Sequence, residues 1–469
     1  MTEDNQVVQL TDRKRTLIFI NLVVSGIASS SLATAMTTAL PDLVEYFGVT
    51  TSIGQWVTSG YSLAMGMVMP LTAFLITRFP TKRLYMWGIT CFIIGLLFSI
   101  FGGSFAVMMV GRVIQACGNG VLQAAAQVII LTVYPAEKKG TMMGTYGLAA
   151  TAAPIIAPTA AGLLIDAFGW KSIFYVVMVI MAISLAISSV VFENVLEIQK
   201  KKFDVLSFVE SIFAFGGVTF GIGNISDFGI ISMQAGLPLA VGIVFCILFV
   251  LRQRGLEKPF LDVNTLQNKN FAVSVVASMV LYLVMMGSSV MMPLYVQSVM
   301  GYSAVVSGLV TLPGSVATAA ISPLAGRMYD RIGIKKIFIA GSAALLISNI
   351  GMYFLTLETP LAVAAGLNVI RNLAIGSLMM PLLTWGTSSV GVRKMADASS
   401  LLTSLRTIAG SIGSAVFVGI MTVVSTNSAA AYGERALIHG MNVAFLGMTA
   451  GAAVLLLIAV FGVKHGGRR

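Results

Sequence analysis

Charged side chains are scarce in this sequence of 469 residues, where Asp, Glu, Lys and Arg make up 10% and hydrophobic residues 57%. Soluble domains carry charge at about a quarter of their positions, so this composition excludes an ordinary soluble protein. Apolar runs of about 20 residues, long enough to cross a bilayer as a helix, recur along the whole chain. Strand-like alternation is absent. We therefore expect an all-α integral membrane protein.

Cysteine and histidine are also rare. Cys91, Cys117 and Cys246 lie within apolar runs, where a free cysteine packs as a small hydrophobe. His439 and His465 fall in a predicted loop and in the C-terminal tail. We therefore expect no metal site, no cofactor and no enzymatic role, because an intramembrane enzyme needs a cluster of such groups at the membrane boundary. The phosphate-binding motif G-x-x-x-x-G-K-[ST] is missing, so we expect no ATP drive.

Basic residues outnumber acidic ones, 29 to 18, and they are unevenly spread. With fourteen spans and a cytoplasmic N-terminus, only Lys171 and Arg435 fall outside, and only Arg112, Arg371 and Arg406 lie within spans. All other Lys and Arg residues face the cytoplasm, as the positive-inside rule requires. We expect a plasma-membrane protein with both termini cytoplasmic. Charge spread over loops that face anionic lipid argues against nucleic-acid binding.

Two polar stretches, residues 193–204 and 252–270, bracket a pair of apolar runs. Six spans precede this pair and six follow it. The expected parts are an N-terminal six-helix bundle at 1–195, a linker with an inserted helix pair at 196–252, and a linker with a C-terminal six-helix bundle at 253–469.

The two halves share a loop signature. The sequence A-x-L-x-T-R-x-P-x-K-R begins at Ala73 after the second span, and G-x-x-x-D-R-x-G-x-K-K begins at Gly326 after the tenth. Many transporter folds consist of such repeats, with the binding site at their interface. The signature indicates a conformational latch, weaker in the first copy, which has Thr77 and Pro80 in place of Asp and Gly. Plain topogenic charge remains the alternative. The latch candidates are Arg78, Gly326, Asp330, Arg331 and Gly333.

The second copy is a complete version of the loop signature of the major facilitator superfamily, and the order of further motifs resembles its fourteen-helix drug:proton antiporter branch, the lincomycin-resistance-type exporters. The matching segments are Ala39-Leu40-Pro41, Gln55-Trp56-Val57-Thr58, Gly111-Arg112-Val113-Ile114-Gln115, Ala153-Pro154-x-x-Ala157-Pro158, Pro293-Leu294-Tyr295 and Arg406-x-x-x-Gly410.

This resemblance implies the major facilitator fold, two six-helix bundles plus an inserted helix pair. It also implies a secondary active transporter that exports small amphipathic compounds in exchange for protons by alternating access. The expected partners are a small-molecule substrate, protons and the lipid bilayer, and we expect a monomer. The alternative is a proton-coupled or uncoupled carrier of a physiological metabolite, peptide or lipid.

The fourth span carries a polar face. Its members Arg112, Gln115, Asn119, Gln123 and Gln127 are spaced three or four apart, which places them on one side of a helix. A central Arg facing lipid costs about 2.5–3.5 kcal/mol on insertion scales. This face therefore points at a cavity or at partner helices; hydrogen bonding between helices is the alternative to a substrate role. Further cavity candidates are Thr34, Asn368, Arg371 and Arg406.

The fifth span carries small residues four apart, which let another helix approach closely, and prolines that bend it. This stretch resembles the antiporter motif of the family, with Ala157 where Gly is common. The antiporter-type residues are Ala153, Pro154, Ala157 and Pro158. Plain close packing is the alternative.

The carboxylate that relatives carry early in span one is replaced here by Leu32. Proton coupling needs a titratable group, and the remaining candidates are Asp42, Glu210 and, by resemblance, Arg112. Arginines within spans and no deep carboxylate should disfavour cations. We therefore expect neutral, zwitterionic or anionic substrates.

Overall fold

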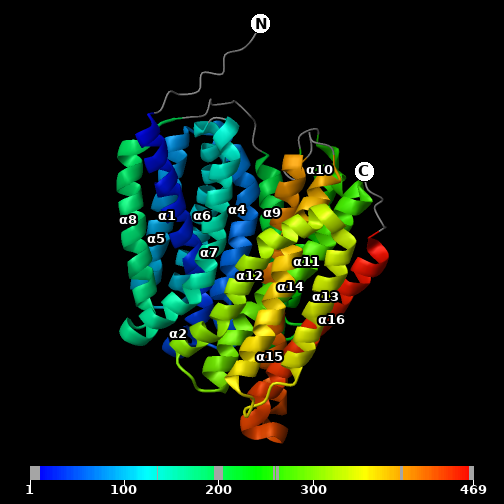
Figure 1. The fold of residues 1–469 in the computed structure, drawn as a ribbon. Coiled ribbons are helices and arrows are strands. Elements are labelled where there is room, and N and C mark those ends of the chain that lie inside the picture. The colour runs from blue at the N-terminus through cyan, green and yellow to red at the C-terminus, as the bar shows by residue number, and fades with distance from the viewer. Residues whose placement is uncertain are drawn as a thin grey trace.

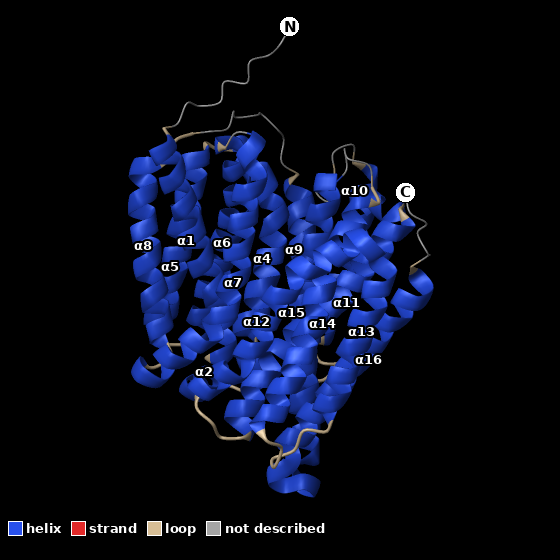
Figure 2. Cartoon of the chain, viewed as in Figure 1, coloured by secondary structure: helices blue, strands red, loops and turns tan. Residues whose placement is uncertain are grey.

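The computed structural model describes residues 11–134, 136–194, 204–256, 259, 263–390 and 395–463, and within some helices it describes the backbone alone. Figure 2 shows helices joined by short loops and no strand in this part of the chain. The predicted all-helical class is confirmed for these residues.

The first half contains α1 (Asp12–Thr38), α2 (Leu40–Phe47), α3 (Thr51–Gly54), α4 (Trp56–Arg78), α5 (Thr81–Phe101), α6 (Phe105–Val133), α7 (Ala136–Phe168) and α8 (Lys171–Val191). The middle contains α9 (Val205–Phe228), α10 (Gly236–Gly255) and the short η1 (Val263–Gln267). The second half contains α11 (Lys269–Leu294), η2 (Tyr295–Val299), α12 (Ala304–Ile332), α13 (Ile334–Tyr353), α14 (Leu361–Ser388), α15 (Met395–Tyr432), η4 (Gly433–Arg435), α16 (Ala436–Leu457) and η5 (Ile458–Gly462).

Eleven segments of the described residues are long and apolar enough to cross a membrane, and one of them, Leu401–Gly462, includes most of α15 and the whole of α16. Large apolar side chains also remain on the surface, among them Val190 on α8, Ile247 on α10 and Ile347 on α13, each more than half exposed. Water does not tolerate apolar surface on this scale, whereas lipid does. The chain is a multi-pass membrane protein.

The buried apolar side chains form two main cores. One contains residues between Ile18 and Phe192 together with Ala304, and the other contains residues between Ala277 and Val463 together with Leu40. We refer to α1–α8 as the N-terminal group and α11–α16 as the C-terminal group. In Figure 1 the two groups stand side by side with their long helices roughly parallel. The predicted domain boundaries near 195 and 252 remain predictions.

The pair α9 and α10 sits against both groups. Phe220 and Gly223 of α9 pack on Trp56 of α4, with a distance of 5.4 Å between the Phe220 and Trp56 ring centroids. Phe249 of α10 is buried in a small cluster with Phe271 of α11 and other side chains of the C-terminal group. The inserted pair therefore bridges the two halves.

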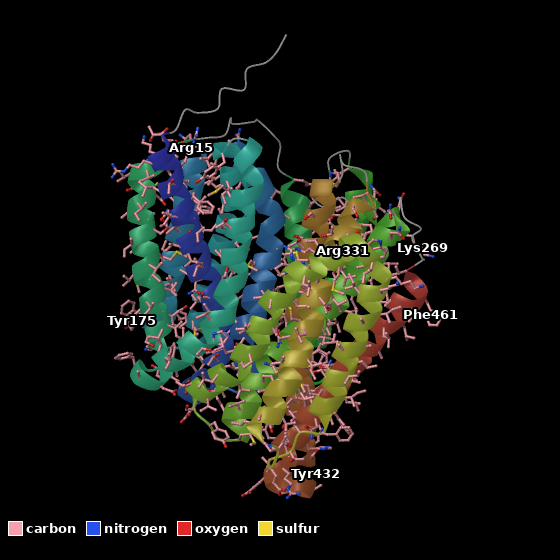
Figure 3. The ribbon with its side chains drawn as sticks, viewed as in Figure 1. Arg15, Tyr175, Lys269, Arg331, Tyr432 and Phe461 are labelled. Atoms are coloured by element: carbon pink, nitrogen blue, oxygen red, sulfur yellow. The ribbon has the colours of Figure 1, made fainter. Side chains whose placement is uncertain are left out.

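We call the end at which α1 begins the inner end, and the opposite one the outer end. Arg15, Lys269 and Arg331 lie toward the inner end, whereas Tyr432 lies at the outer end (Figure 3). α1 stops at Thr38, and Pro41 occupies the first turn of the separate helix α2. Asp42, expected at the outer end of the first span, therefore lies on this short outer helix, which Gly48 ends at φ 61°.

The two groups meet closely near the outer end, where α7 packs against α12. A Cβ added to Gly162 would lie 2.6 Å from the Ala304 carbonyl oxygen, and one added to Gly308 would lie 2.7 Å from the Thr159 Cα. The Thr159 hydroxyl donates to the Gly308 carbonyl at 3.1 Å. The outer interface is therefore closed in this structure.

Candidate functional site

A cavity of about 100 Å³ lies between the two groups. Thr34, Thr37 and Pro158 line it from the N-terminal group. The C-terminal group contributes Met285, Ser288, Ser289, Met292, Pro293, Thr311, Ser315, Asn368, Arg371, Asn372 and Ile375. Four residues that the sequence singled out, Thr34, Pro158, Asn368 and Arg371, thus surround one space at the interface of the halves.

Arg371 is the charged residue of this central cavity. Its side chain comes from the middle of α14, and the residue is only 3% exposed. One guanidinium nitrogen donates to Asn368 Oδ1 and another contacts Met352 Sδ at 3.2 Å, while Nε has no hydrogen-bond partner. The ion pairs found in the described part of the chain, which involve Lys14, Arg15 and Arg252, do not include it.

Two amides stand beside this guanidinium. Asn372 Nδ2 donates to the Asn368 carbonyl at 2.9 Å and to Asn368 Oδ1 at 3.0 Å. The Thr318 hydroxyl of α12 lies 3.2 Å from Asn372 Oδ1 and donates to it. Gly314 leaves room for both amides, because its Cβ would lie within 2.8 Å of each amide nitrogen. Sequence reasoning missed Thr318 and Gly314, and only the small-residue content of this span could have indicated them.

Arg112 lies in a different environment. It is fully buried in α6, where Nε donates to the Val57 carbonyl at 3.1 Å and Nη1 to Gln115 Oε1 at 2.7 Å. Its guanidinium stacks over the Tyr61 ring at 4.2 Å, and Nη2 has no hydrogen-bond partner. Val57 and Tyr61 belong to α4, so Arg112 joins α4 to α6.

The rest of the predicted polar face continues this pattern. Gln115 Nε2 donates to the Ser99 hydroxyl of α5 at 2.9 Å, and Asn119 Nδ2 donates to the Tyr61 hydroxyl at 2.8 Å. Gln123 is half-buried, and the side chain of Gln127 lies outside the described residues. Arg112, Gln115, Asn119 and Gln123 line neither the central nor the outer cavity. The contacts of Arg112, Gln115 and Asn119 match the interhelical alternative left open by the sequence.

Arg406 lies in α15 near α11, and its guanidinium sits over the Tyr282 ring at 4.7 Å. The residue is half-buried and its Nε has no hydrogen-bond partner. It does not line the central cavity. The structure therefore separates Arg406 from Arg371 and Asn368, with which the sequence grouped it.

A second cavity, of about 430 Å³, opens at the outer end between α2, α7 and the start of α12. Asp42, Glu45 and Asp166 line it from the N-terminal group, facing Gln297 and Tyr302. Asp166 Oδ2 accepts from the Val305 backbone N–H at 3.3 Å, and Gln297 Nε2 donates to the Thr38 carbonyl at 3.1 Å. Both hydrogen bonds cross from one group to the other.

Asp42 is the most enclosed carboxylate of this outer cavity. Burial raises the pKa of Asp42, and the neighbouring charges of Asp166 and Glu45 raise it further. Its Oδ2 is buried without a hydrogen-bond partner. The carboxyl group is therefore easier to protonate here than in water.

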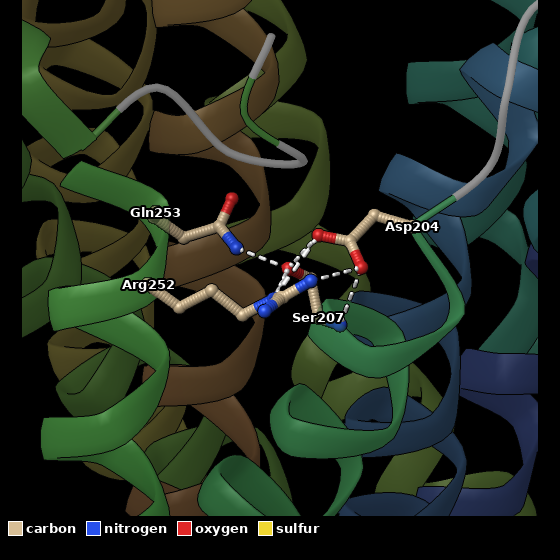
Figure 4. Close-up of polar contacts among 4 residues, drawn as sticks. All are labelled: Asp204, Ser207, Arg252 and Gln253. Carbon is tan, nitrogen blue, oxygen red and sulfur yellow. Dashed lines mark hydrogen bonds and ion pairs between the residues drawn. The ribbon is translucent and has the colours of Figure 1, made fainter. Parts of the chain in front are cut away.

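The inserted pair carries a polar cluster at its inner end (Figure 4). Arg252 of α10 donates to both carboxylate oxygens of Asp204, at 2.8 and 3.2 Å, and Gln253 Nε2 donates to the Ser207 hydroxyl at 2.6 Å. Burial opposes ionisation of Asp204, but hydrogen bonds from Arg252 and Ser207 outweigh it and lower its pKa. Glu210, one of the proton-coupling candidates, is half-buried in α9 two turns away and has a buried, unpartnered Oε2.

The latch candidates and the antiporter-type residues lie partly outside the residues that the structure describes. The side chains of Asp330, Ala153 and Pro154 lie outside the described residues, so their predicted roles stay predictions. Of the latch candidates, Arg78 and Arg331 are exposed near the inner end, Gly326 is half-buried, and Gly333 ends α12 at φ 75°. Of the antiporter-type residues, Ala157 and Pro158 are buried in α7. Among the residues searched, no group of three His, Cys, Asp or Glu side chains could hold a metal ion.

Residues 18–414 match the family model of the Major Facilitator Superfamily. The chain belongs to this superfamily. It is 32% identical to an uncharacterized MFS-type transporter, YcnB of Bacillus subtilis, with 94% of this chain and 93% of the relative covered. It is 30% identical to the lincomycin resistance protein LmrB of the same organism, with 96% and 95% covered. The predicted resemblance to lincomycin-resistance-type exporters is confirmed.

The fold agrees with this assignment. The crystal structure of a bacterial homologue of the human lysosomal transporter Spinster, in an inward-facing and unoccupied conformation, superimposes with a TM-score of 0.71 at 14% identity, covering 97% of this chain and 98% of that one. Because the major facilitator superfamily is a family of transporters, the prediction that this chain is not an enzyme is confirmed. It is a membrane transporter for a small-molecule substrate.

Proposed function

We propose that this transporter is a secondary active exporter of small amphipathic compounds, driven by exchange for protons. The observation that carries the proposal is the central cavity, which side chains from both groups line while the outer interface is closed. A solute bound in this cavity exchanges with one side of the membrane at a time when the two groups move against each other around it. The name of the relative LmrB supports an export role.

The proposal includes fourteen membrane spans, formed by α1 and by each helix from α4 to α16. The protein lies in the plasma membrane, and both termini are in the cytoplasm. Basic residues such as Arg15 and Arg331 lie toward the inner end (Figure 3). That charge distribution follows the positive-inside rule. We further propose that the transporter works as a monomer without ATP.

Asp42 is our leading proton-coupling residue. It lies at the closed outer interface, where its pKa is raised by burial and by two neighbouring carboxylates. Opening of the interface would hydrate the group and favour release of its proton to the outer side, and closure would favour uptake of a proton from that side. Glu210 is the second candidate. Arg112 is a weaker one, because its contacts join α4 to α6 and it lines neither cavity.

The test uses a deletion strain and proteoliposomes. Loss of the transporter should sensitise cells to amphipathic compounds, and purified protein should move those compounds against their gradient only while a pH gradient exists. Growth limitation by a missing nutrient, with unchanged compound sensitivity, would instead support the alternative, a carrier of a physiological metabolite, peptide or lipid. The uncharacterized relative YcnB leaves that alternative open.

A further inference from the structure

We propose that the carboxylate of an amphipathic organic anion binds Arg371 in the central cavity. The inference rests on the proposed function for its setting, and it adds the class of compound and the residue that recognises it. Three buried or half-buried arginines were candidates from the sequence; of these, Arg371 lines the central cavity, and Arg112 and Arg406 line neither of the two cavities described above.

The charge of Arg371 has no counter-ion in the described part of the chain. Arginine stays protonated in proteins, so its charge cannot be removed by titration. A buried charge without a partner is strongly unfavourable, yet Arg371 is 3% exposed and forms none of the ion pairs found there. A bound anion would supply the missing partner, and the planar guanidinium matches the geometry of a carboxylate.

The guanidinium of Arg371 leaves one donor for the ligand. Asn368 Oδ1 already accepts from Arg371 and from Asn372. The Nε of Arg371 has no hydrogen-bond partner. A ligand that brings acceptor oxygens would satisfy this group, whereas an ammonium ligand would add a second unpaired donor and a like charge.

The remainder of the lining suits an apolar body. Met285, Met292 and Ile375 face the cavity, and methionine side chains adapt to ligands of different shape. The hydroxyls of Ser288 and Ser289 donate to backbone carbonyls of their own helix. A cavity of about 100 Å³ has room for the carboxylate and a few carbon atoms, and drug-sized ligands need about 300 Å³ or more. The rest of the ligand would enter as the groups separate at the inner end.

The test measures equilibrium binding to the full-length protein in lipid nanodiscs, with 2-naphthoate, its methyl ester and a naphthyl trimethylammonium ion as probes. Hydrogen bonds to charged groups predict that naphthoate binds at least about tenfold more tightly than the ester. Arg371→Gln should abolish this preference, and Arg371→Lys should restore part of it. Arg406→Gln, an arginine variant outside the cavity, should keep it.

Equal affinity for the acid and the ester in the unchanged protein would overturn the inference, and so would tighter binding of the ammonium probe. This comparison uses only the unchanged protein, so it tests the inference even if Arg371→Gln does not fold. Binding requires no proton gradient. Failure of gradient-driven export would therefore refute the proposed function alone, while export of neutral compounds without preference for the carboxylate would refute this inference alone.

Discussion

At the scale of single residues, three arginines in spans have three different surroundings. Arg112 is held by a backbone carbonyl, a glutamine and a tyrosine ring, Arg406 rests on Tyr282, and Arg371 faces a cavity. An arginine within the membrane is costly wherever it lies, so each needs compensation from its neighbours or from a ligand. All three side chains carry the same charge, so what distinguishes Arg371 from Arg112 and Arg406 is its position at the central cavity.

Arg112→Lys tests the assignment of Arg112 to helix packing. A lysine cannot reach both Val57 and Gln115, so we expect the free energy of unfolding to fall by about 2 kcal/mol. Unfolding by denaturing detergent would measure this loss. Arg406→Lys, which loses only a ring contact, should cost less. Unchanged stability combined with weaker substrate binding would show that Arg112 contacts substrate instead.

Asp42 should make outer closure depend on pH. Because its pKa is raised in this closed state above the ordinary 3.8, the closed state binds a proton more tightly than a hydrated open state. Closure is therefore favoured as the pH falls through the raised pKa of Asp42. The stabilisation of the closed state reaches its full size once the pH is below the ordinary pKa of 3.8. Raising the pH favours opening.

The measurement is alkylation of Thr38→Cys from the outer side, in a protein that lacks Cys91, Cys117 and Cys246. Thr38 is buried in the closed interface, so its labelling rate reports opening. The rate should rise with pH, and Asp42→Asn should make it nearly independent of pH. Glu434→Gln, at an exposed outer position, should leave the profile unchanged. Identical profiles for Asp42→Asn and the unchanged protein would exclude Asp42 as the titrating group.

At the scale of helices, the contact between α7 and α12 depends on glycine. Gly308→Ala places a Cβ 2.7 Å from the Thr159 backbone, which forces the helices apart. Overpacking of this kind costs about 1–3 kcal/mol, so we expect the closed state to become about tenfold less populated and Thr38→Cys to react faster. Gly366→Ala in α14, where a Cβ meets nothing within 4 Å, is the matched control. Equal labelling of both variants would contradict the closed interface.

The inserted pair α9–α10 is tied together at its inner end by Asp204 and Arg252. Asp204→Ala removes this ion pair and also the cap of the first turn of α9, where Asp204 Oδ1 accepts from the Ser207 N–H. We expect faster amide hydrogen exchange at the start of α9 and the end of α10, and unchanged transport. Glu193→Ala, which breaks the exposed pair with Lys14, should leave α9 protected. A global loss of protection would contradict a local role.

Sequence patterns predicted individual helices better than contacts between helices. The spacing of Arg112, Gln115 and Asn119 predicted one buried polar face on α6, which the structure contains. Their partners on α4 and α5 were not predictable, because the register between neighbouring helices leaves no local pattern. Ser288 and Ser289 were missed for a similar reason: serines that bond to their own helix backbone carry no signal in an apolar run.

At the scale of the whole molecule, the two groups have separate apolar cores and meet through α7 with α12 and through α4 with α15. Among the residues whose side chains the structure describes, Ala304 and Leu40 are the members of these two clusters that come from the opposite group. Both lie near the outer end. In the alternating access that we propose, each group moves as a unit while the outer contacts break and re-form. The repeated loop signature predicted two related halves, but which end would be closed could not be read from it.

Distances between spin labels at Phe168→Cys and Tyr302→Cys test the central claim most directly. These exposed positions flank the closed outer interface, one at the end of α7 and the other just before α12. For a protein that transports, alternating access predicts a short distance, as in this structure, and a second, longer distance whose population grows as the pH rises. A single short distance at every pH and with substrate present, in protein that still transports, would contradict it.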